Sequence, residues 1–73
     1  MAFYEIVATC FSHTGEIVKI AKNRMEADTI FLELKNSALK QLNVPSKESA
    51  LVEIIKKGGE MNFERIKRER IVH

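Results

Sequence analysis

At 73 residues with one cysteine, the chain has room for one small core and cannot form an intrachain disulfide. Its 45% hydrophobic and 30% charged residues are typical of a folded domain, and no apolar run approaches the ~20 residues of a membrane helix. The net charge of +2 is uneven, because residues 56–73 carry six Lys or Arg against three acids. We expect one small domain over residues 1–73, stabilised by packing and by self-association.

The first 22 residues predict a β-hairpin. Residues 3–12, FYEIVATCFS, are rich in β-branched and aromatic side chains, and residues 16–22, EIVKIAK, form a second such run. If Ser12 pairs with Glu16, the face that meets a helix holds Tyr4, Ile6, Ala8, Cys10, Val18 and Ile20. The opposite face then holds Phe3, Val7, Phe11, Ile17 and Ala21, broken by Glu5, Thr9 and Lys19. This second face is too apolar to face water alone, so we expect something to cover it.

Residues 23–43 predict one long helix. Asn23 can cap its start and Glu26 follows at capping-box spacing. Asn43 can take a left-handed conformation after its end, and Pro45 prevents continuation. The apolar residues recur at helical intervals at Ala27, Ile30, Phe31, Leu34, Ala38 and Leu42.

Residues 46–57 are compatible with two structures. As a short helix, they would begin at a Ser46 cap and end before Gly58, and this arrangement is the one we favour. The alternative is a strand that turns at Gly58-Gly59 into a second hairpin. A two-residue turn there would place Glu53 opposite Glu64, which disfavours the hairpin, although a three-residue loop avoids that pair.

The C-terminal residues 60–73, EMNFERIKRERIVH, are compatible with a helix, whose apolar stripe would be thin, or with a strand, which we favour. As a strand they could join the sheet parallel to the first strand. The expected fold is therefore α+β, with a hairpin, a long helix, a short second helix and a C-terminal strand, in the order ββααβ. The alternative order, with the second hairpin, is ββαββ.

The residues that carry chemistry give no catalytic or metal pattern. Cys10 and His13 lie three apart, but a structural zinc site needs four ligands, and Cys10 is expected in the core. Ser12, His13 and Asp28 are the residue types of a hydrolytic triad, but residue types alone do not indicate one, because a triad is defined by its geometry. The Gly58-Gly59 pair lacks the following Lys and Ser or Thr of a phosphate-binding loop. We expect no enzymatic activity, no metal and no cofactor.

The basic C-terminal segment is a candidate for binding nucleic acid. Its cations are Lys56, Lys57, Arg65, Lys67, Arg68 and Arg70. Three glutamates interleave with them and can form ion pairs across strands, which dilutes the positive charge. The nearby aromatic residue, Phe63, is expected in the core rather than available for stacking on bases.

The surplus of apolar surface favours a role in binding protein. Phe3, Val7, Phe11 and Ile17 would expose a contiguous apolar patch in a monomer, and such patches mark interfaces. We expect a non-enzymatic interaction module that forms a homodimer and regulates or inhibits a larger protein. Size and layout resemble those of accessory proteins from phages and mobile elements, without a diagnostic motif. The N-terminus has no basic segment of a signal peptide, so we expect a cytoplasmic protein that does not enter a membrane.

Overall fold

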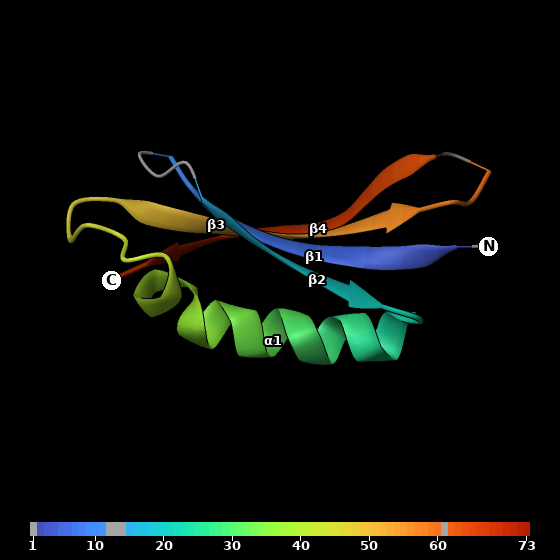
Figure 1. Cartoon of the computed structure of the whole chain (residues 1–73), viewed down its shortest axis with the longest axis horizontal. Coiled ribbons are helices and arrows are strands. Elements are labelled where there is room, and N and C mark those ends of the chain that lie inside the picture. The colour runs from blue at the N-terminus through green and yellow to red at the C-terminus, as the bar shows by residue number, and fades with distance from the viewer. Residues whose placement is uncertain (1, 12–14, 61) are drawn as a thin grey trace.

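The computed structural model describes residues 2–11, 15–60 and 62–73, and it shows an α+β fold of two layers (Figure 1). Four strands form one antiparallel sheet: β1 (Phe3–Cys10), β2 (Glu16–Ala21), β3 (Ser49–Lys57) and β4 (Phe63–Val72). Their order across the sheet is β2-β1-β3-β4. The single helix of the described residues, α1 (Arg24–Gln41), packs against one face of this twisted sheet.

The first hairpin is present, but its predicted register was wrong. Glu16 pairs with Thr9 rather than with Ser12, and Val18 pairs with Val7. This difference is an odd number of residues, and an odd shift moves every side chain of a strand to the other face. Ile17 therefore lies on the helix side and packs against the core, whereas Val18 and Ile20 lie on the opposite face.

The predicted helix is confirmed, with its caps. The Asn23 side chain accepts a hydrogen bond from the Glu26 backbone N–H at 2.8 Å, and Glu26 accepts one from the Lys22 N–H at 3.3 Å. At the other end Asn43 has a φ of 52°, in the left-handed region. The Val44 N–H then reaches back to the carbonyl of Leu39 at 3.0 Å, which satisfies a helix-end acceptor.

The helix predicted over residues 46–57 was wrong, because this segment is the central strand β3. Its apolar residues fit both periods: Ala50, Leu51, Ile54 and Ile55 share a helical face, whereas alternate residues share a strand face. In the structure the alternate residues share one face: Ala50, Val52 and Ile54 lie beneath α1 and are almost inaccessible to solvent. Pairing with β1 on one side and β4 on the other outweighs local helix preference.

The alternative order, ββαββ, is the one observed. Gly58, directly after β3, has a φ of 79°, which glycine adopts without steric cost. The register avoids the Glu53–Glu64 pair, because Glu53 lies opposite Arg68 and Glu64 lies opposite Lys56. The final strand was correctly predicted as a strand, but it lies at the sheet edge, paired antiparallel with β3, rather than beside β1.

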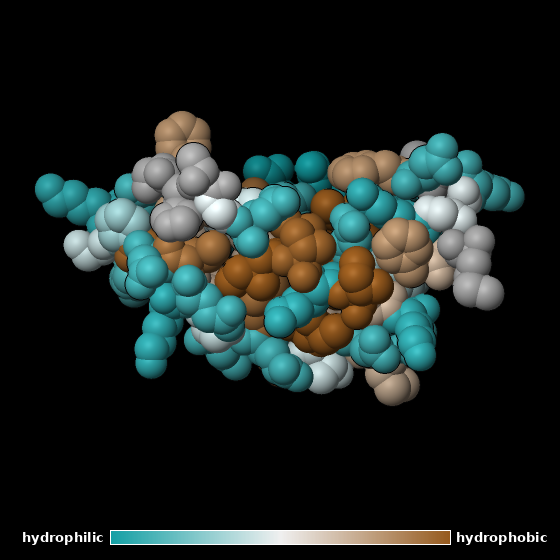
Figure 2. All heavy atoms as spheres, viewed as in Figure 1, coloured by the Kyte–Doolittle hydropathy of each residue, from teal (hydrophilic) through white to brown (hydrophobic). Residues whose placement is uncertain are grey.

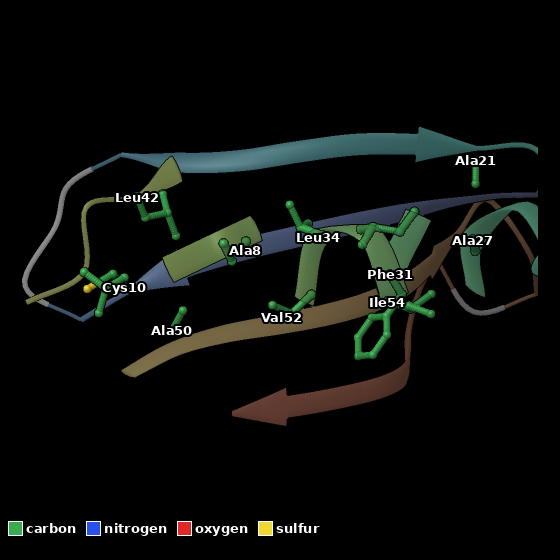
Figure 3. Packing of buried hydrophobic residues seen from close by; sticks show 13 residues of the cluster. Ala8, Cys10, Ala21, Ala27, Phe31, Leu34, Leu42, Ala50, Val52 and Ile54 are labelled. Carbon is green, nitrogen blue, oxygen red and sulfur yellow. The ribbon is translucent and has the colours of Figure 1, made fainter. Parts of the chain in front are cut away.

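The core lies between α1 and the covered face of the sheet. Phe31 is its largest fully buried side chain, and Figure 3 shows it projecting from α1 toward Ile54 of β3. Leu34 from the helix and Val52 from β3 continue the same layer. Small buried side chains, the alanines and Cys10, lie where the helix packs on the sheet. The buried set is Ile6, Ala8, Cys10, Ala21, Ala27, Phe31, Leu34, Ala38, Leu42, Val44, Ala50, Val52 and Ile54.

Candidate functional site

The face of the sheet opposite α1, which we call the open face, is covered by no element of the described residues (Figure 1). Strand alternation assigns its residues, because the even-numbered residues of β1 and β3 face the helix, most of them buried, and the odd-numbered ones point away. The paired residues of β2 and β4 extend the assignment across the sheet. The open face is thus defined residue by residue from the register.

Apolar side chains from all four strands lie on the open face, interleaved with Glu5, Glu53 and Lys57, and we call this apolar set the apolar strip. Val18 and Ile20 of β2 are 44% and 55% exposed, and they pair with Val7 and Glu5 of β1. Phe63 of β4 is 51% exposed. Among the described residues of the four strands, the apolar set of the open face is Phe3, Val7, Val18, Ile20, Leu51, Ile55, Phe63 and Val72. This face therefore exposes more apolar surface to water than is usual for the solvated face of a sheet in a monomer.

Two ion pairs cross the open face. Glu5 of β1 contacts Lys57 of β3 at 3.1 Å, and Glu53 of β3 contacts Arg65 of β4 at 2.6 Å. The Glu53 carboxylate is the more enclosed partner, with 15% of its side chain exposed. These pairs neutralise the acids in the middle of the sheet, so they leave a face that is apolar toward β2 and positive along β4.

The six predicted basic residues do not form one patch. Lys57, Arg65, Arg68 and Arg70 lie on the open face. Lys67 lies on the helix side, where its Nζ sits 4.7 Å from the centre of the Phe31 ring. Lys56 shares that side, since it pairs with the helix-facing Tyr4. Among the described residues, Arg68 and Arg70 contact no carboxylate, so they are the open-face cations that remain available.

A shallow groove of about 230 Å³ lies at one end of the open face. It brings together Phe11, which follows β1, and the two arginines of β4. Phe11 is wholly exposed, at 103% of its reference surface. The groove is lined by Thr9, Phe11, Ser49, Ala50, Leu51, Arg68 and Arg70.

The two edges of the sheet differ in character. β2 is a short edge strand, and a second groove of about 210 Å³ separates it from α1. Figure 2 shows apolar atoms gathered in the middle of this side of the molecule, over β2 and α1. The other edge, β4, is rich in charges of both signs and contains a β-bulge: Ile54 pairs with Lys67 and Ile55 with Arg65, which leaves Ile66 as the extra residue.

The residues considered for catalysis or metal binding are not assembled in the described part of the chain. Cys10 is buried, and its Sγ lies 3.6 Å from a Glu48 carboxylate oxygen. Asp28 forms an ion pair with Arg24 at 3.1 Å on the helix surface. Ser12 and His13 lie outside the described residues. Within residues 2–11, 15–60 and 62–73 no three potential metal ligands come together. In those same ranges no helix has the length and apolar character needed to span a membrane.

The structure separates the four predicted interface residues. Phe3 and Val7 are half-buried on the open face, Phe11 is exposed beyond β1, and Ile17 lies on the helix side. Sequence reasoning missed Val18, Ile20, Leu51, Ile55, Phe63 and Val72 as open-face residues. The first two follow from the correct hairpin register, and the next two from β3 being a strand. Phe63, expected in the core, is exposed because its partner Lys57 points away from the helix.

Comparison of the chain with protein-family models, curated proteins and solved structures finds no match.

Proposed function

We propose that the chain is a non-enzymatic protein-interaction module that binds other protein surfaces through its open face. In the absence of another partner, this face meets the same face of a second copy and forms a homodimer. The module acts in the cytoplasm as a regulator or inhibitor of a larger protein. The observation that carries the proposal is the apolar strip on the uncovered side of the sheet.

The size of the open face fits a weak to moderate interface. The longest strands have eight to ten residues, and strands rise about 3.3 Å per residue and lie about 4.8 Å apart. Each open face therefore measures on the order of 500 Å². Two copies would bury on the order of 1,000 Å², which is where specific protein interfaces begin.

The chemistry of the strip also fits a protein partner. Its Val, Leu and Ile side chains stabilise an interface when water is removed, and two ion pairs satisfy the acids that lie among them. A partner that covers Ile20 and Val18 gains their burial without leaving a carboxylate of the central strands unpaired.

Replacing Ile20 by Asp tests the proposal, because Ile20 is exposed in a single copy and its change leaves the core intact. In a two-fold dimer the change is made twice, and burial of each Ile contributes about 2 kcal/mol. We expect dimerisation to weaken on the order of 1,000-fold. Light scattering after size exclusion should give twice 8.4 kDa for the unchanged chain and 8.4 kDa for Ile20→Asp.

Met25→Asp is the matched control, since Met25 is an 81% exposed apolar residue on α1, away from the open face. It should leave the dimer mass unchanged. An unchanged chain that stays at 8.4 kDa up to about 1 mM would refute the homodimer. Dissociation of both variants to the same degree would place the interface elsewhere.

Nucleic-acid binding is a second candidate, favoured by two observations. Arg68 and Arg70 have no carboxylate partner among the described residues, and Phe63 is exposed rather than buried in the core. Affinity for single-stranded DNA that falls steeply as salt rises would support this function. Affinity that is absent even at low salt would exclude it.

A further inference from the structure

The groove at one end of the open face combines three kinds of chemical group that the apolar strip does not need. Two guanidinium groups, one exposed aromatic ring and two hydroxyls line it together. The cations come from β4, the ring follows β1, and the hydroxyls belong to Thr9 and Ser49. The fold therefore brings side chains from distant parts of the sequence to one site.

Arg68 and Arg70 are placed to hold an anion. They are separated by one residue on the same strand, so both project from the open face, about 7 Å apart at their backbones. Arg65 and Lys57, on the same face, are neutralised by Glu53 and Glu5. Guanidinium groups bind phosphate oxygens through two parallel hydrogen bonds, which makes this arginine pair suited to a phosphate group.

Phe11 supplies a flat apolar surface beside the cations. Its ring is wholly exposed and contributes nothing to the core. An exposed aromatic ring is the stacking platform that proteins use for nucleic-acid bases, and the neighbouring arginines offer planar groups for the same purpose. The hydroxyls of Thr9 and Ser49 add hydrogen-bonding capacity on the groove wall.

We propose that this groove binds one nucleotide unit, with its phosphate on Arg68 and Arg70 and its base stacked on Phe11. The inference rests on the second function proposed above and names its site. A carboxylate alone would use the arginines but not the ring, so the exposed Phe11 favours a nucleotide over an acidic peptide. The unit is either a free nucleotide or one nucleotide of a single strand, since both present the same chemistry.

The test is fluorescence anisotropy with a labelled 15-mer of deoxythymidine at low salt. Phe11→Ala should weaken binding by about 5- to 100-fold, the effect of one stacked base. Arg68→Glu with Arg70→Glu should weaken it further. The matched control is Lys40→Glu with Lys47→Glu, which changes the net charge equally at two exposed positions outside the sheet. The control should cost less than a tenth of the loss caused by the arginine pair.

The outcomes separate the site from the function. If the 15-mer binds but neither Phe11→Ala nor the arginine pair differs from the control, the groove is refuted while nucleic-acid binding stands. If the 15-mer fails to bind at all, both are refuted. If heparin binds equally well and Phe11→Ala has no effect, the arginines form only a general anion patch and the nucleotide site is refuted.

Competition with thymidine monophosphate identifies the source of the nucleotide. Displacement of the 15-mer at millimolar concentrations supports a site for free nucleotides. If the 15-mer is sensitive to Phe11→Ala but is not displaced, the result supports a site for one unit of a strand, whose neighbouring phosphates add affinity.

Discussion

The contact between Lys67 and Phe31 gives a quantitative test of the packing between β4 and the helix. The Lys67 Nζ lies 4.7 Å from the centre of the Phe31 ring, and Phe31 is 2% exposed. A cation over an aromatic face at a partly solvated site contributes about 0.5–1 kcal/mol. Lys67→Met removes the charge and keeps an apolar stem, so we expect it to lower the free energy of unfolding by that amount.

A double-mutant cycle isolates this term. Phe31→Leu preserves most of the core volume and should cost about 1 kcal/mol. Phe31→Ala would cost about 3–5 kcal/mol, too much for a chain of this length, whose whole stability is about 4–11 kcal/mol. In the Phe31→Leu background Lys67→Met should cost nothing, which gives a coupling energy of about 0.5–1 kcal/mol.

Urea unfolding followed by far-ultraviolet circular dichroism measures the cycle. With a slope of about 1 kcal/mol per M for a small domain, Lys67→Met should shift the midpoint by about 0.5–1 M in the original chain. It should shift the midpoint by less than about 0.2 M in the Phe31→Leu background. Equal shifts in both backgrounds would refute the cation–π contact and imply that Lys67 acts through β4 pairing alone.

Three further predictions concern the backbone and the register. Gly58→Ala should destabilise the chain by about 1 kcal/mol, because alanine is strained at the observed φ of 79°, whereas Gly59→Ala should cost less; denaturation of both variants compares them. Asn23→Ala should remove the helix cap at 2.8 Å and cost about 1 kcal/mol, which lowers the melting temperature by about 4–8 °C. Val7→Cys with Val18→Cys should form an intrachain disulfide on mild oxidation, because these residues are Cα partners; mass spectrometry that finds only free thiols would contradict the hairpin register.

Local signals in the sequence were sufficient for the helix. Asn23, Glu26 and Asn43 each act within a few residues of their position, and all three do in the structure what their residue types favour. The presence of the first hairpin and the strand character of the C-terminal segment were also predictable from local composition.

Long-range pairing decided what sequence reasoning got wrong. Residues 49–57 can alternate as a strand or form a helical stripe, and the choice depends on pairing with β4 and above all with β1, which lies far away in sequence. The register of the first hairpin depends on the conformation of its loop, and an odd error exchanged Ile17 for Val18 and Ile20 on the open face. The groove around Phe11 needs three separate strands, so no local pattern predicted it.

The unequal edges of the sheet have a consequence for how the molecule can assemble. β2 presents a short strand with uninterrupted pairing, whereas β4 is protected by its bulge and its dense charges. If sheets join side by side, they do so through β2, and each copy has one such edge. Pairing of two β2 edges therefore gives a closed dimer. Two edges that could both pair would instead allow open-ended assembly of sheets.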